Sequence, residues 1–120
     1  MTADFKTGTN LAGKVLVAAQ CTIAGNNTVY TVPALSAVKV SSAALCNTTG
    51  SPVTVSVSVV PSGGTVGVTN RVVDSYPLAA HDSMVINEIS GALLDAGAAI
   101  NVNTSAANAV NIVMTGAVSS

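Results

Sequence analysis

PVTVSVSVVPSGG, residues Pro52–Gly64, is the stretch that decides the fold class. Valines alternate with hydroxyl side chains along it, until Pro61-Ser62-Gly63-Gly64 ends the run. An alternation with a period of two places successive side chains on opposite faces of a strand. The pattern predicts that the valines face a core and the hydroxyls face outward, the valines being Val53, Val55, Val57 and Val59 and the hydroxyl residues Thr54, Ser56 and Ser58.

Strand-like runs of the same kind recur along the chain, separated by Gly, Pro and Asn turn signals. The expected strands are Lys14–Ile23, Thr28–Val32, Ala37–Cys46, Val53–Val60, Arg71–Ser75, Ser83–Ile89, Ala98–Asn103 and Ala109–Val118. Glycines bracket Leu93–Ala99, so we expect a connection there with at most one helical turn. About eight short strands predict an all-β fold, a single antiparallel β-sandwich of jelly-roll or Ig-like type. Residues 1–13 lack periodicity and are expected to form an extended N-terminal arm, with the sandwich domain at 14–120.

The composition is apolar but poor in large side chains. Hydrophobic residues make up 49% of the 120 residues, yet the aromatics are only Phe5, Tyr30 and Tyr76. Because an aromatic side chain buries about 150–250 Å², a core of Val and Ala offers less burial per residue. We therefore expect a marginally stable monomer that gains burial by self-association.

Charge is scarce, at 8% of residues against about 25% in typical soluble domains. The net charge is −1, and the basic residues are scattered at Lys6, Lys14, Lys39 and Arg71. Phosphate contact needs concentrated cations, so nucleic-acid binding is not expected. The N-terminus shows no basic segment followed by an apolar one, and no apolar run is long enough for a bilayer. We expect a chain without a signal peptide or membrane partner, made in the cytoplasm.

The cysteines Cys21 and Cys46 allow at most one disulfide. By alternation Cys21 is in phase with Val17 and Ala19, and Cys46 with inward residues of its own strand, which are Val38, Val40 and Ala44. Two buried, reduced thiols are favoured over a disulfide, which remains the alternative.

No motif predicts catalysis, metal binding or a cofactor. His81-Asp82-Ser83 holds triad residue types, but consecutive residues in extended chain cannot converge, so a polar turn before the next strand is favoured. The cysteines lack zinc-site spacing, and the acidic residues are isolated. Gly63–Gly67 lacks the lysine and helix of a phosphate loop and indicates a turn. We expect no catalytic, cofactor-binding or metal-ligating residue.

Four segments resemble small structural proteins of tailed-bacteriophage virions. They are TVYTVPA (Thr28–Ala34), AVKVSSAALCNTTGSPVTVSVSVVPSGG (Ala37–Gly64), NRVVDSYPLAAHDS (Asn70–Ser83) and LLDAGAAINVNTSAANAVNIVMTGAV (Leu93–Val118). The chain is similar, in everything after the N-terminal arm, to capsid decoration and head-fibre β-sandwich proteins.

The resemblance implies a non-enzymatic capsid decoration protein on the outer surface of the virion. Its expected partners are the major capsid protein, other virion proteins and further copies of itself, with a homotrimer matching the threefold positions of an icosahedral shell. The alternative is a receptor- or carbohydrate-binding module on a tail or head fibre. Tyr30 and Tyr76 are its only candidate stacking platforms, although each adjoins a strand end where a buried corner role is favoured.

Overall fold

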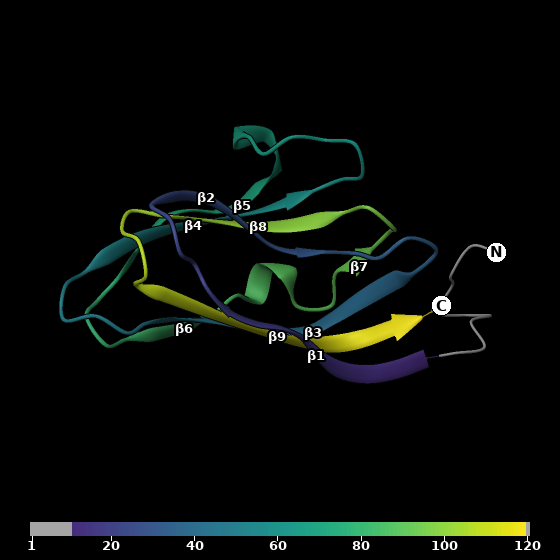
Figure 1. Ribbon diagram of the computed structural model, residues 1–120, viewed down its shortest axis with the longest axis horizontal. Helices are drawn as coiled ribbons and strands as arrows, with labels where there is room; N and C mark the ends of the chain where they lie inside the picture. The colour runs from purple at the N-terminus through teal and green to yellow at the C-terminus, as the bar shows by residue number, and fades with distance from the viewer. Residues whose placement is uncertain (1–10, 120) are drawn as a thin grey trace.

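The computed structural model describes residues 11–119, which form a sandwich of two antiparallel sheets (Figure 1). Sheet A contains, in spatial order, β1 (Leu11–Gln20), β9 (Val110–Ser119), β3 (Ala37–Asn47) and β6 (Ser83–Val85), with β7 (Leu93–Leu94) also pairing with β3. Sheet B contains β2 (Gly25–Thr31), β8 (Ala99–Thr104), β4 (Val53–Val60) and β5 (Arg71–Leu78). Within the described part of the chain, the helical segments are two 3₁₀ turns, η1 (Val68–Asn70) and η2 (Asn87–Ile89).

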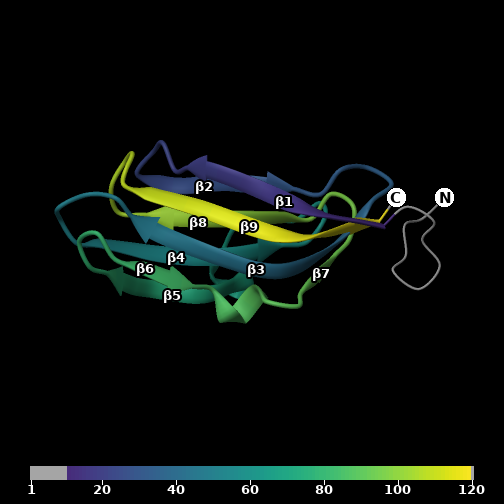
Figure 2. The same cartoon turned by 90° about the horizontal axis from the view of Figure 1, so that it is seen from below.

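The strand order identifies the sandwich as a jelly roll. The chain alternates between the sheets through β1, β2, β3 and β4, and again through β7, β8 and β9. This alternation places the first and last strands side by side in sheet A, as Figure 2 shows. A double-sheet arrangement of this kind is the jelly-roll solution to an antiparallel fold. Of the two sandwich types predicted, the topology therefore selects the jelly roll.

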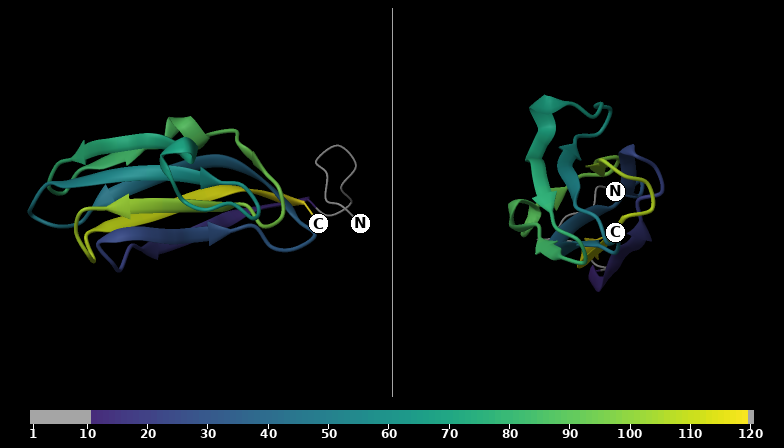
Figure 3. Two further views of the ribbon diagram at one scale, coloured as in Figure 1. Left: turned by 90° about the horizontal axis from the view of Figure 1, so that it is seen from above. Right: turned by 90° about the vertical axis from the view of Figure 1, so that its left-hand side faces the viewer.

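The core lies between the sheets and consists of aliphatic side chains. Its largest fully buried members are Leu45, Leu78, Ile86, Ile89, Ile100, Ile112, Met114, Val32, Val38, Val40, Val55 and Val57. Both sheets contribute to it, and the end view in Figure 3 shows the two layers facing one another. At about 25 cal/mol per Å² of apolar surface, these side chains supply the main stabilisation of the fold.

Bulges interrupt several strands. In sheet A, the pairing of β1 with β9 shifts between Val15 and Val17, and that of β3 with β9 shifts between Val40 and Ser42. The β1 shift lies opposite the Met114–Thr115 step of β9, and the β3 shift lies opposite the adjoining Thr115–Gly116 step. An inserted residue reverses which side chains face the core farther along the strand. The face assignments of β1 and β3 therefore change at this level of the sheet.

Most of the predicted strands are present, with changes at their ends. β5 continues past Ser75 to Leu78, and the strand predicted at Ser83–Ile89 ends at Val85, after which η2 follows. The segment predicted as a connection contains β7. β1 already begins at Leu11, inside the expected arm, and residues 1–10 of that arm lie outside the described residues.

The alternation along β4 assigns the two faces of the strand correctly, but two of its outward serines are buried and not exposed to solvent. Val53, Val55 and Val57 are buried, Val59 is half-buried and Thr54 is exposed, but Ser56 and Ser58 are 7% and 3% exposed. Ser56 Oγ accepts a 2.8 Å hydrogen bond from the backbone N–H of Ser75, which has a positive φ of 50° in the bulged strand β5. The connection that carries η1 lies over this side of β4 (Figure 1). The two serines do point away from the core, but other parts of the chain cover them.

Candidate interaction surface on sheet A

A row of apolar side chains crosses the outer face of sheet A. The strand register pairs Ala18 with Val113, Val113 with Ala44, and Ala44 with Val85. Residues directly opposite in antiparallel strands project to the same face. Val113 and Val85 are 47% and 58% exposed, so the row projects away from the core. We call these residues, Ala18, Val113, Ala44 and Val85, the sheet A row.

The rows on either side are also short of charge. Val15, 56% exposed, is paired with Thr115, whose hydroxyl lies 3.0 Å from that of Ser42. The other neighbouring row contains Gln20, Asn111, Cys46 and Ser83. Farther along the strands, Lys39 is paired with Ala117 and with Leu93, which is 67% exposed. Among these described positions of the outer face, Lys39 alone carries a full charge at neutral pH.

A shallow hollow lies beside the sheet A row. It has a volume of about 450 Å³ and is lined by Ala18, Ala19, Gln20, Asn111, Ile112 and Val113. Two of the lining residues, the small Ala18 on β1 and the larger Val113 on β9, are paired in the strand register. In the described structure the side-chain oxygen of Asn111 is buried and has no hydrogen-bond partner. The outer face of sheet A therefore offers both projecting valines and a shallow depression beside them.

The outer face of sheet B is polar by contrast. Asn103 Nδ2 donates to Asn26 Oδ1 at 2.8 Å, and Asn101 Nδ2 donates to Thr28 Oγ1 at 3.4 Å. On edge strand β5, Arg71 Nη1 lies 2.8 Å from Asp74 Oδ1. Side chains that bond to one another in this way have less to gain from a partner surface. The two outer faces of the sandwich thus differ in chemistry.

The edges of both sheets are protected against pairing with another strand. In sheet A, β1 carries Lys14 and a bulge, and β6 contains only three residues. In sheet B, β2 has a bulge near Val29, and β5 has register shifts and Pro77. Bulges, short strands, Lys and Pro at an edge all oppose strand addition. Association through a face is therefore favoured over association through an edge.

The cysteines differ in position, contrary to the prediction that both are inward. Cys21 is 1% exposed, and burial raises the pKa of its thiol. Cys46 is half-buried on the outer face, because the bulge between Val40 and Ser42 reverses the phase of β3. Val38 and Val40 remain inward, whereas Ala44 and Cys46 turn outward. Both thiols are free, as predicted, and no disulfide joins them.

The residues with triad chemistry do not form a catalytic arrangement. His81, with a φ of 57°, lies in the turn before β6, and Asp82 Oδ1 accepts a 2.9 Å hydrogen bond from the Ser83 N–H. The three side chains are exposed and belong to a polar turn that leads into a strand, as the sequence indicates. Among residues 11–119, no group of three or more His, Cys, Asp or Glu side chains is placed to hold a metal ion.

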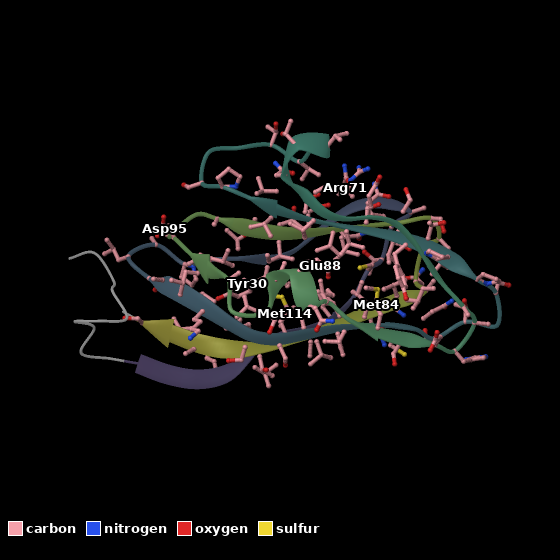
Figure 4. The ribbon with its side chains drawn as sticks, turned by 180° about the vertical axis from the view of Figure 1, so that it is seen from behind. Tyr30, Arg71, Met84, Glu88, Asp95 and Met114 are labelled. Carbon is pink, nitrogen blue, oxygen red and sulfur yellow. The ribbon has the colours of Figure 1, made fainter. Side chains whose placement is uncertain are left out.

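The glycine-rich segment and the tyrosines also have defined places. The backbone N–H of Gly64 donates to the carbonyl of Pro61 at 2.9 Å, so the segment opens with a turn, as predicted. Tyr30 packs against the core, and burial raises the pKa of its phenol (Figure 4). Tyr76, in contrast, is 45% exposed on edge strand β5. The predicted burial is therefore met in part by Tyr30, which is half-buried, and is wrong for Tyr76.

Sequence reasoning missed the sheet A row. The four residues come from four strands and become neighbours only through the register, which two bulges shift. The available signal was the lack of charge across the strands that contain them.

Comparison with family models, with curated proteins and with solved structures finds no match for this chain. The similarity to bacteriophage virion proteins accordingly stays a prediction from the sequence. In the part of the chain that the structure describes, no helix is both long and apolar enough to cross a membrane.

Proposed function

We propose that this chain is a non-enzymatic structural protein of a virion, which decorates the outer surface of a capsid and stabilises the shell. The observation that carries the proposal is the apolar, almost uncharged outer face of sheet A. Exposed apolar patches of this kind mark interaction sites. The scarcity of charge in the whole chain suits a protein held at high density beside identical copies.

The fold supports this class of function by analogy. Jelly rolls occur in viral capsid domains and in lectins, although a fold alone does not assign a function. A rigid sandwich that binds at many equivalent positions of a shell gains from multivalency, because each contact raises the effective concentration for the next. In the proposal, the partners are the major capsid protein and other virion proteins, and the chain acts without catalysis or a cofactor.

Self-association is part of the proposal, and a homotrimer is the form that matches the threefold positions of an icosahedral shell. The proposed arm would reach along the shell or a sister copy. Deletion of residues 1–10 leaves β1 intact, since β1 begins at Leu11. We expect this deletion to weaken shell binding while the β-sheet circular dichroism spectrum stays unchanged. Unchanged binding would remove the arm from the mechanism.

The direct test is the location of the chain on purified particles. Gold-labelled antibody against this chain should decorate the outer capsid in negative-stain images, and purified chain should co-sediment with shells that lack it. Decorated shells should also resist heating or osmotic shock better than undecorated ones. Label confined to the tail, or shells whose resistance does not change, would contradict the capsid assignment.

A receptor- or carbohydrate-binding module is the second candidate, favoured by the exposure of Tyr76 on β5. Exposed aromatic rings are natural platforms for sugars because one face is apolar. Tyr76→Ala should then abolish binding on a glycan array without loss of folding. Val72→Ala, at a partly exposed position of the same strand, is the matched control. No binding by the wild-type chain would exclude this candidate for the glycans on the array.

A further inference from the structure

We infer that the outer face of sheet A is self-complementary and is the contact between two copies of this chain related by a twofold axis. The inference rests on the self-association in the proposed function, but it assigns a pair and not the proposed homotrimer. In paired copies the contact with the shell falls to other surfaces of the chain. A twofold contact uses the same patch on both copies, so that patch must fit itself when it is reversed.

The sheet A row meets this requirement through its order of side chains. From β1 to β6 the row reads Ala18, Val113, Ala44, Val85, so that small and larger side chains alternate. A twofold axis parallel to the strands, lying between the two stacked faces and midway between β9 and β3, reverses the row on the second copy. Val113 of one copy then lies opposite Ala44 of the other, and Val85 lies opposite Ala18. Each projecting valine meets an alanine along the whole row.

The geometry of stacked sheets is compatible with this fit. Sheets pack about 10 Å apart with strand directions within about 30° of each other, so the central pairs stay opposed even when the rows cross. The hollow beside Ala18 lies at the position to which the twofold axis brings Val85 of the second copy. Val85 is 58% exposed, so its side chain is available for this contact.

The charged residue of the paired outer positions lies at one end of the contact. Lys39 is exposed and, at about 3.3 Å per residue, is roughly 15 Å along β3 from Ala44. An axis parallel to the strands keeps the two Lys39 side chains at the same level, where their flexible stems carry both charges out to solvent at the end of the sheet. Salt screens the repulsion that remains, because the Debye length is about 10 Å at 0.1 M.

The available area suits a weak pair. The strands β1, β9 and β3, of ten or eleven residues and about 4.8 Å apart, together with the three-residue β6, give a face of about 500 Å² per copy. Two such faces bury about 1,000 Å², in the range of weak or transient interfaces. The polar outer face of sheet B and the protected edges leave this face as the apolar surface of matching size in the described structure.

Sedimentation of the full chain over a range of concentrations tests the inference. Wild-type chain should show a reversible rise to twice the monomer mass. Val113→Glu places an unpaired charge at the centre of the contact and should raise the dissociation constant by about tenfold or more. Val68→Glu, at a position on η1 that is 78% exposed, is the matched control and should associate as wild type does. If Val113→Glu does not fold, Val85→Glu on the short strand β6 tests the same row.

A mixing experiment separates pairing from any effect on folding. Ala44→Asp and Val113→Lys should each weaken association alone. A mixture of the two variants should associate again, because the twofold axis places the introduced carboxylate of one copy opposite the introduced ammonium group of the other. A wild-type chain that stays monomeric, equal association of Val113→Glu and wild type, or a mixture that does not recover would each overturn the inference.

The outcomes also distinguish the pairing from the proposed function. A trimer that persists in both single variants would overturn the twofold pairing while leaving the proposed trimer in place. Binding to shells is measured separately. A chain that pairs but does not bind shells would contradict the decoration role without contradicting the pairing.

Discussion

At the scale of single residues, buried polar side chains organise the ends of the sandwich. Asn47 is fully buried at the end of β3, where its Nδ2 donates to the carbonyls of Ser51, Leu78 and Ala79 at 2.8, 3.2 and 3.1 Å. Its Oδ1 accepts from the backbone N–H and the hydroxyl of Thr49. One side chain thereby joins β3, the following turn and the end of β5. An asparagine is suited to this position because it offers donors and an acceptor together.

We expect Asn47→Ala to lower the free energy of unfolding by about 2–4 kcal/mol, because it removes a buried bond to the Leu78 carbonyl and part-buried bonds to the carbonyls of Ser51 and Ala79. Asn26→Ala is the matched control, since Asn26 is exposed and its side chain bonds to Asn103 on the sheet surface. The control should change stability by no more than about 0.5 kcal/mol. Urea denaturation measures both, and similar losses in the two variants would contradict the role assigned to Asn47.

Ser56 gives a second prediction at this scale. Its hydroxyl accepts the N–H of Ser75 at a bulge in β5 where the ladder supplies no partner. Ser56→Ala should therefore cost about 1–2 kcal/mol, more than an outward-facing serine would. Thr54→Ala, at an exposed position of the same strand, should be nearly neutral. Chemical denaturation in which the two variants match would show that the Ser75 N–H finds another partner.

Burial of Cys21 and Tyr30 predicts a loss of stability in alkali. Burial raises the pKa of both groups, so the folded chain holds their protons to a higher pH than the unfolded chain does. The stability that the two protonated groups contribute is fully present below their unfolded pKa values, about 8.5 for a thiol and 10 for a phenol. That stability is lost as the pH rises through the pKa values of the folded chain. The urea midpoint should therefore fall above about pH 8.5, and less steeply in the double variant Cys21→Ala, Tyr30→Phe. Parallel profiles would contradict the prediction.

At the scale of strands, the bulges decide which side chains are buried. β9 runs between the bulged strands β1 and β3, and its Gly116 lies close to both. A methyl group at this position would overlap the backbone carbonyl oxygen of Lys39 and would also meet the side chain of Leu16. The absence of a side chain here lets three strands approach at the level where two of them carry an extra residue.

Gly116→Ala should therefore destabilise the sandwich by about 2–3 kcal/mol, because backbone atoms of β3 must move to make room. Gly67→Ala is the matched control: its backbone is extended, with a φ of −168°, and no atom lies within 4 Å of the added carbon. Thermal or urea unfolding of both variants checks the prediction. A stable Gly116→Ala chain would show that β3 and β9 can separate at this level without cost.

The strands show how far the sequence predicts the structure. The alternation in β4 correctly assigns Val53, Val55 and Val57 to the core, because a buried face depends on a local period of two. The same rule applied to β3 fails for Cys46, because a bulge reverses the strand, and the bulge depends on how β9 pairs with β3 and not on the local sequence. On β4 the rule fails to predict the burial of Ser56, because the separate strand β5 and its bulge cover that hydroxyl. For the same reason the sheet A row, built from four strands, cannot be predicted from any one of them.

At the scale of the whole molecule, the shortage of charge is distributed unequally. The outer face of sheet B uses its amides and hydroxyls in bonds within the sheet, whereas the outer face of sheet A presents valines and alanines. A freely diffusing monomer gains nothing from such a face, because exposed apolar area favours association. The low charge of the chain and the exposed row are both in line with the proposed pairing of two identical surfaces.

Pairing through sheet A predicts a thermal stability that depends on protein concentration. Because the pair forms only from folded chains, a higher protein concentration favours the folded state. Each tenfold rise in concentration increases the free energy of unfolding by about 1.4 kcal/mol per mole of pair. For a domain of this size such a change should raise the unfolding midpoint by roughly 2–5 °C. Val113→Glu should remove the dependence, whereas Val68→Glu should retain it, since Val68 lies on η1 and outside the sheet A row. Scanning calorimetry at several concentrations measures all three chains. A midpoint that does not change with concentration in the wild type would mean that the exposed row is covered by something other than a second copy.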